Sequence, residues 1–143
     1  MFYACFLSFT VDVHTNLSLP SSGNIGMVET RIVSRHQAIR TVGDNESQGD
    51  SVVTALISYL SLLGIVRSLF SVRQSNSISS LFICESVEEL RSLREHYESG
   101  LMKEVLQDIF SLLAGEPVEI SRLEWTTEQY DHCLHQFGRF YFI

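Results

Sequence analysis

Residues Leu81–Leu134 read LFICESVEELRSLREHYESGLMKEVLQDIFSLLAGEPVEISRLEWTTEQYDHCL, and this stretch decides the fold that we expect. A short apolar run ends at Cys84. Ser86, with Glu89 three residues later, then forms a capping box, which predicts that a helix begins at once. Apolar residues recur at helical spacing among charged ones, at Val87, Leu90, Leu93 and Tyr97. We therefore expect a helix over 87–98 that packs one face on a core.

A second helical segment follows the interruption at Ser99-Gly100 and ends at Gly115-Glu-Pro117. Apolar residues cover more of its surface than in the first helix, at Leu101, Val105, Leu106, Ile109, Phe110, Leu112 and Leu113. EISRLEWT then alternates Leu123 and Trp125 with charged residues, as a strand does. Thr126 and Gln129 form a second capping box and predict a short last helix that ends near Gly138.

Upstream of this stretch, the pattern is also one of strands and a helix. Phe9, Val11 and Val13 alternate with polar residues, which predicts a first strand, and residues 20–50 are mainly polar and predict a loop. An apolar helix is expected from Ser51 to Leu63, with Gly64 at its end. The runs 65–73 and 78–84 are joined by a turn and predict a hairpin.

This order predicts an α+β fold of the ferredoxin-like kind, β-α-β-β-α-β, with a short C-terminal helix added. Two helices are expected to cover one face of a four-stranded antiparallel sheet. We divide the chain into a first strand and long polar loop over 1–50, the core of the domain over 51–137, and an apolar tail over 138–143. In the core we expect Leu90, Leu93, Tyr97, Ile109, Leu123, Trp125 and Tyr130 to be mostly buried.

Composition narrows the class of partner. The formal net charge of −7 and a pI near 5.1 oppose binding to nucleic acid. Three widely spaced cysteines, Cys5, Cys84 and Cys133, favour a reducing cytoplasm over a disulfide framework. The first residues lack a positive region and the run 51–66 is too short to span a bilayer, so we expect neither secretion nor a membrane partner.

The sequence offers a few candidates for a metal site, a cysteine nucleophile or acid-base carboxylates, and each has a simpler structural explanation. His132, Cys133 and His135 are too few and too poorly spaced for zinc, and Cys84 stands beside an acidic residue that opposes a thiolate. Arg91 and Arg94 alternate with glutamates along 87–98, which is typical of a solvated helix face. We therefore expect no catalytic residue, no bound metal and no cofactor.

The helix with Leu90, Leu93, Tyr97 and Ser99-Gly100, together with the later passage through Glu128, Tyr130, Cys133 and Leu134, resembles the N-terminal domain family of the TNF-receptor-associated death-domain adaptor, TRADD. The resemblance covers roughly residues 50–137. It implies binding without catalysis, by an adaptor in death-receptor-like (apoptosis) or innate-immune signalling with a TRAF-family protein as partner.

The residues themselves leave two functions open. One is a protein-interaction module that binds through the face of the sheet left open by the helices, where Arg67, Arg73 and Arg122 alternate with apolar residues. The other is an RNA-binding or small-molecule enzyme domain on the same topology. The first is our prediction, because the strands carry no RNP pattern of basic and aromatic residues.

Overall fold

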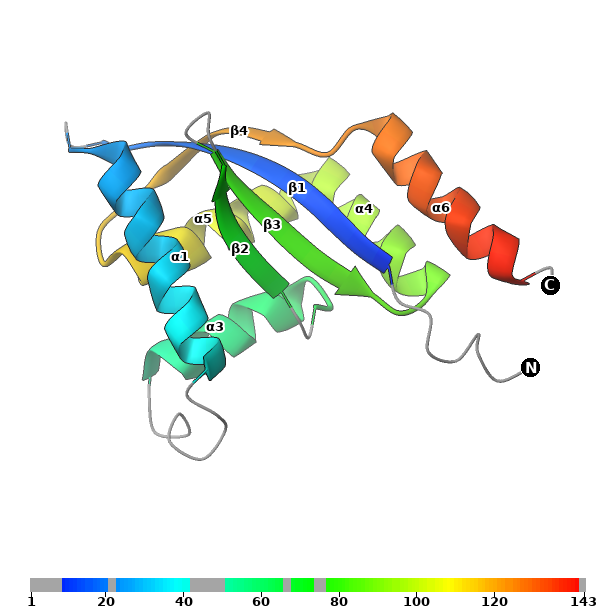
Figure 1. Ribbon diagram of the computed structural model, residues 1–143, viewed down its shortest axis with the longest axis horizontal. Coiled ribbons are helices and arrows are strands. Elements are labelled where there is room, and N and C mark those ends of the chain that lie inside the picture. Colours follow the sequence, from blue (N-terminus) through cyan, green and yellow to red (C-terminus); the bar gives the residue numbers. More distant parts are fainter. Residues whose placement is uncertain (1–8, 21–22, 42–50, 66–67, 74–76, 142–143) are drawn as a thin grey trace.

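The structure is a computed structural model, and it describes residues 9–20, 23–41, 51–65, 68–73 and 77–141. In these ranges four strands and five helices follow one another (Figure 1). In chain order they are β1 (Phe9–Ser18), α1 (Ile25–Thr41), α3 (Ser51–Leu62), β2 (Ser68–Arg73), β3 (Ser77–Cys84), α4 (Val87–Ser99), α5 (Leu101–Ala114), β4 (Glu119–Glu124) and α6 (Thr127–Tyr141).

The strands form one antiparallel sheet in the order β2-β3-β1-β4. β1 is central, because it pairs with β3 over Phe9–Asn16 and with β4 over His14–Ser18. The register between β1 and β4 shifts at Ser121, whose hydroxyl donates to the carbonyl of Asn16 at 3.1 Å. This bulge lets Ile120 face the core while both Ser121 and Arg122 stay exposed.

The core lies between one face of the sheet and the helices. Val11, Val13 and Leu17 of β1 are buried there, as the two-residue period of a strand requires. α5 is the central helix, since it contacts α1, α3, α4 and β4. Figure 1 shows α4 and α5 behind the sheet, while α6 extends past the end of β4 and lies beside α4.

The local signals around α4 and α5 are confirmed. The amide of Glu89 donates to the Ser86 hydroxyl at 3.1 Å, and the Gln129 amide donates to the Thr126 hydroxyl at the same distance. Gly100 adopts a φ of 92°, which breaks the apolar run into two helices, and Gly115 ends α5 at a φ of 76°. Both values lie in the left-handed region that favours glycine.

The predicted ferredoxin-like β-α-β-β-α-β order is wrong, although the class remains α+β. The described elements run β-α-α-β-β-α-α-β-α, because α1 occupies the segment expected to be a loop and Gly100 separates α4 from α5. The last helix is not short either: α6 has 15 residues and continues through Gly138, so the expected tail begins inside a helix. Residues 142–143 lie outside the described part.

The predicted core is confirmed at four positions: Leu90, Leu93, Ile109 and Trp125 are 0–1% exposed. Tyr97, Leu123 and Tyr130 are half-buried and pack against this core. The prediction of a solvated face fails at Arg94, which is only 8% exposed. Its guanidinium lies over the rings of Tyr97 and Trp125 and is shielded from solvent, whereas the side chain of Arg91 is exposed.

Replacing Leu93 by Ala is expected to cost about 2 to 5 kcal/mol of unfolding free energy, because the substitution leaves a cavity in a close-packed core. Urea unfolding of the purified protein measures this loss. A loss below about 0.5 kcal/mol, the range of ordinary surface substitutions, would contradict the burial of α4 against the sheet.

Candidate functional site

The candidate site is the face of the sheet turned away from α4 and α5, which we name the open face. In Figure 1 no described helix crosses in front of β1 and β3. Apart from Ser77 and Ser79, its residues with described side chains are half-buried or exposed. They are Thr10, Asp12, His14 and Asn16 of β1, Ser77, Ser79, Leu81 and Ile83 of β3, and Arg122 and Glu124 of β4.

The register arranges these residues in rows across the strands. One row runs Ser71, Ser79, His14, Glu124, and the next row runs Arg73, Ser77, Asn16, Arg122. In the other direction, Leu81 pairs with Asp12 and Ile83 pairs with Thr10. The open face is therefore polar toward one end of the strands and more apolar toward the other.

Two of the three predicted arginines belong to the same row. Arg73 ends β2 and Arg122 lies in β4, so they stand at opposite edges of the sheet, about 14 Å apart by the usual strand spacing. The Arg122 side chain is 68% exposed and forms an ion pair with Glu124. Arg67 lies outside the described residues. The structure thus brings Arg73 and Arg122 into one row by pairing strands that are far apart in sequence.

A polar cluster on the open face combines serine, aspartate and histidine. The Ser79 hydroxyl donates to Oδ1 of Asp12 at 2.5 Å, and Nε2 of His14 lies 3.3 Å from Oδ2 of the same carboxylate. In a hydrolytic triad the histidine stands between serine and aspartate and takes the serine proton. Here the aspartate stands in the middle, so His14 is not placed to take the proton of Ser79. The half-buried side chains of Asp12 and His14 offer hydrogen-bonding groups to a partner, whereas Ser79 is buried.

The two described cysteines are also poor nucleophiles. Burial, with smaller contributions from the charges of Glu89 and Cys133, raises the pKa of Cys84 to about 12. Burial likewise raises the pKa of Cys133. Sequence reasoning identified the right effect on Cys84 but the wrong carboxylate, since the neighbour that acts is Glu89 rather than Glu85. Almost no thiolate forms at Cys84 near pH 7.

The pair His132 and His135 stays on the exposed side of α6, while Cys133 packs against the core. Nε2 of His132 lies 3.0 Å from the side-chain amide of Gln136. Within the described ranges, no group of three or more His, Cys, Asp and Glu side chains is arranged to hold a metal ion. The structure thus does not bring the histidines of α6 together with further ligands.

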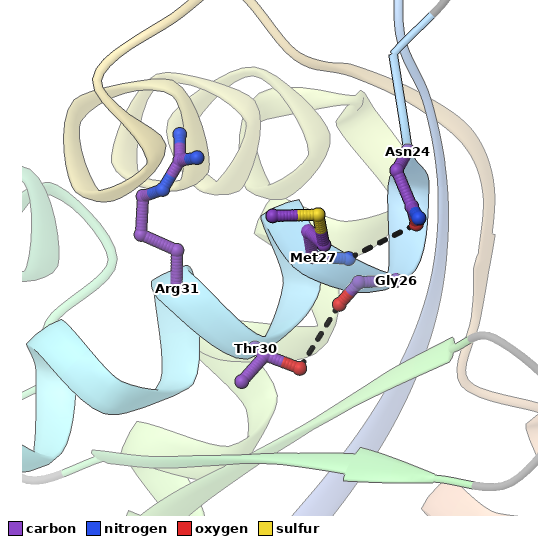
Figure 2. A pocket seen from close by; sticks show the side chains of 5 residues that line it. All are labelled: Asn24, Gly26, Met27, Thr30 and Arg31. Carbon is purple, nitrogen blue, oxygen red and sulfur yellow. Dashed lines mark hydrogen bonds between the residues drawn. The ribbon is translucent and has the colours of Figure 1, made fainter.

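A shallow hollow of about 550 Å³ lies at the start of α1 (Figure 2). Its polar groups already form hydrogen bonds within α1 and with the end of α5. Oδ1 of Asn24 accepts from the Met27 amide at 3.2 Å, the Thr30 hydroxyl donates to the Gly26 carbonyl at 2.9 Å, and Arg31 donates to the Ala114 carbonyl at 2.8 Å. With its donors and acceptors used in this way, the hollow is a weaker candidate than the open face.

Sequence reasoning missed Asp12, His14 and Ser79. The alternation along residues 9–14 did contain a signal, because it assigned Asp12 and His14 to the side opposite the buried valines. The missing information was the pairing of His14 with Ser79, 65 positions later in the sequence, which local patterns do not encode.

In the described part of the chain, no helix has both the length and the apolar character needed to cross a membrane. Comparison with known proteins gives no match: no protein-family model, no curated protein and no solved structure is significantly similar to this chain. The similarity to the TRADD N-terminal family stays a prediction from the sequence.

Proposed function

We propose that this protein is a non-catalytic interaction module, an adaptor, that binds a protein partner through the open face. The observation that carries the proposal is the exposed side chain of Arg122, which pairs across the sheet with the half-buried Asn16 and lies next to the cluster of Asp12, His14 and Ser79. The half-buried Leu81 and Ile83 adjoin this polar area. Arginine next to small apolar patches is typical of non-obligate protein interfaces.

The charge of the molecule favours a protein over a nucleic acid as the partner. Seventeen acidic residues against ten basic ones repel a phosphate backbone. The described side chains of the open face include no Phe, Tyr or Trp on which a base would stack. Its charges are mixed, with Glu124 beside Arg122 and Asp12 further along the same face, and this mixture suits a protein surface of similar polarity.

The sequence resemblance to the TRADD N-terminal family indicates which protein partner to test first for binding. An adaptor of the TRADD N-terminal kind implies a TRAF-family protein and a place in death-receptor-like or innate-immune signalling, in the cytoplasm. The resemblance rests on packing and capping residues of 50–137, so it does not assign contact residues. The contact residues in the proposal come from the open face itself.

Replacing Arg122 by Glu is expected to weaken binding to a purified TRAF-family protein about tenfold or more. Arginine is among the residues that dominate interface energetics, and the reversed charge lies beside Glu124 in the substituted face. Biolayer interferometry against the immobilised partner measures the affinity. Unchanged far-UV circular dichroism shows that the variant is folded, as the 68% exposure of the side chain leads us to expect.

The matched controls are Glu88→Arg and Glu95→Arg, because both residues are exposed on α4, away from the open face. Each control is expected to bind like the original protein. If the α4 reversals abolish binding while Arg122→Glu does not, the recognition surface is the helical face. If the original protein fails to bind any TRAF-family protein, the partner assigned by resemblance is wrong.

A further inference from the structure

The first half of α1 contains a buried carboxyl group that forms no hydrogen bond with any described residue. Glu29 is 1% exposed, as deeply buried as the apolar residues Val28 and Ile32 beside it. Neither of its carboxyl oxygens has a hydrogen-bond partner among the described residues. An ionised carboxylate is very unfavourable in such a place, whereas a protonated one is far less so.

The position of Glu29 follows from that of His36. Nε2 of His36 lies 3.1 Å from the carbonyl of Ser68, and its ring stacks on Phe70 at 4.3 Å, so this side of α1 faces β2. Residues seven apart in a helix share a face, and Glu29 therefore points toward the sheet about 10 Å further along the axis. Figure 1 shows α1 and β2 side by side and running in opposite directions, so the start of α1 lies toward the end of β2.

Among the described residues, the charged side chains around α1 do not compensate Glu29. Arg31 is two residues away and thus on the other side of the helix, where it bonds to Ala114 and Glu116; Arg35 bonds to the carbonyl of Leu113. The other described charged or titratable side chains of the packed elements are His36 on α1 and Lys103, Glu104 and Asp108, which are exposed on α5. Burial alone raises the pKa of Glu29 above its ordinary value of 4.5.

We propose that Glu29 is a pH-sensitive latch: its carboxyl is neutral while α1 is docked, and its ionisation releases α1 from β2 and α5. The proton leaves to solvent, and the resulting carboxylate gains hydration only when the helix moves away. Docking of α1 is therefore fully stable below pH 4.5, where Glu29 is protonated in both states, and is lost as the pH rises through the native pKa. Above that point, each pH unit raises the ratio of released to docked α1 up to tenfold.

Hydrogen exchange followed by NMR on the full chain tests the latch between pH 4.5 and 8. After correction for the intrinsic rate, protection of the α1 amides is expected to fall with rising pH, up to tenfold per unit. The amides of α4, which does not adjoin α1, serve as the internal reference and are expected to keep their protection. In Glu29→Gln, which has nearly the same shape but no titrating proton, α1 protection is expected to stay constant.

The matched control is Glu104→Gln, which removes an exposed carboxylate from α5 and is expected to keep the original pH profile. A direct readout is the titration of the Glu29 carboxyl ¹³C shift, assigned by its absence in Glu29→Gln. Because burial raises the pKa of Glu29, the midpoint is expected above 4.5. The latch is refuted if that midpoint lies at 4.5 or below, or if Glu29→Gln keeps the pH dependence. It is also refuted if α4 loses protection together with α1, because the transition is then global unfolding.

Discussion

Replacing Arg94 by Ala is expected to lower the free energy of unfolding by about 3 kcal/mol, because this buried arginine joins α4 to the passage from β4 to α6. Its Nη1 donates to the carbonyl of Trp125 at 2.6 Å, and its Nε pairs with Glu98 at 3.2 Å. The guanidinium lies 4.7 Å from the ring centre of Tyr97 and 5.2 Å from those of Trp125 and Tyr130. Alanine leaves a buried carbonyl unpaired and uncovers three rings.

Urea unfolding followed by Trp125 fluorescence measures this effect, since Trp125 is the single tryptophan of the chain. The native emission of Arg94→Ala is expected to shift to the red as water reaches the indole. Arg94→Lys should lose less than Arg94→Ala, because it keeps the charge over the rings but not the planar fork of donors.

Arg91→Ala is the matched control, three residues earlier on the same helix and exposed. Its loss should stay within about 0.5 kcal/mol. Equal losses for Arg91→Ala and Arg94→Ala would show that Arg94 is an ordinary surface residue and that the aromatic site around it does not form.

Replacing Phe110 by Ala is expected to cost about 3 to 5 kcal/mol, the range for a buried phenylalanine. Phe110 is fully buried on α5, and its ring meets Phe70 edge to face at 5.3 Å. Phe70 in turn stacks on His36, so three rings connect α5, β2 and α1. Truncation opens a cavity at the α5 end of this stack and removes an aromatic pair. Thermal unfolding by circular dichroism and urea titration both report the loss.

Phe110→Leu should recover more than half of that loss, because it restores most of the apolar volume. Ile57→Ala on α3 is the control of similar chemistry, since Ile57 is 62% exposed and no cavity follows its truncation. A Phe110→Ala protein as stable as Ile57→Ala would contradict the packing of α5 against α1 and the sheet.

Local sequence determined the elements from β3 onward. The two capping boxes at Ser86 and Thr126 satisfy amide groups at helix starts, and Gly100 and Gly115 permit the left-handed turns at helix ends. These interactions span at most four residues, so their signature is complete within the sequence around them. The α+β class and the core positions Leu90, Leu93, Ile109 and Trp125 followed from the same patterns.

The candidate site was predicted in part. Strand periodicity indicated that Arg73 and Arg122 share a side with polar residues, and pairing through β3 and β1 places both in one row. The cluster of Asp12, His14 and Ser79 was not predicted, since it depends on the register between strands that are distant in the chain. A shift of one residue would have turned His14 into the core.

By itself, the sequence determined which segments form helices and strands wherever the apolar period was clean, together with the acidic charge that opposes nucleic acid. Only the tertiary structure decided which polar side chains are buried on the inward faces of helices. Residues 20–50 were expected to be a loop because they are mainly polar, yet they contain a 17-residue helix in which the polar Glu29 and His36 are buried. Arg94 looks like a surface residue until Trp125, Tyr97 and Tyr130 surround it. The physical reason is that burial of a polar group depends on partners brought from distant segments, and these partners exist only once the chain has folded.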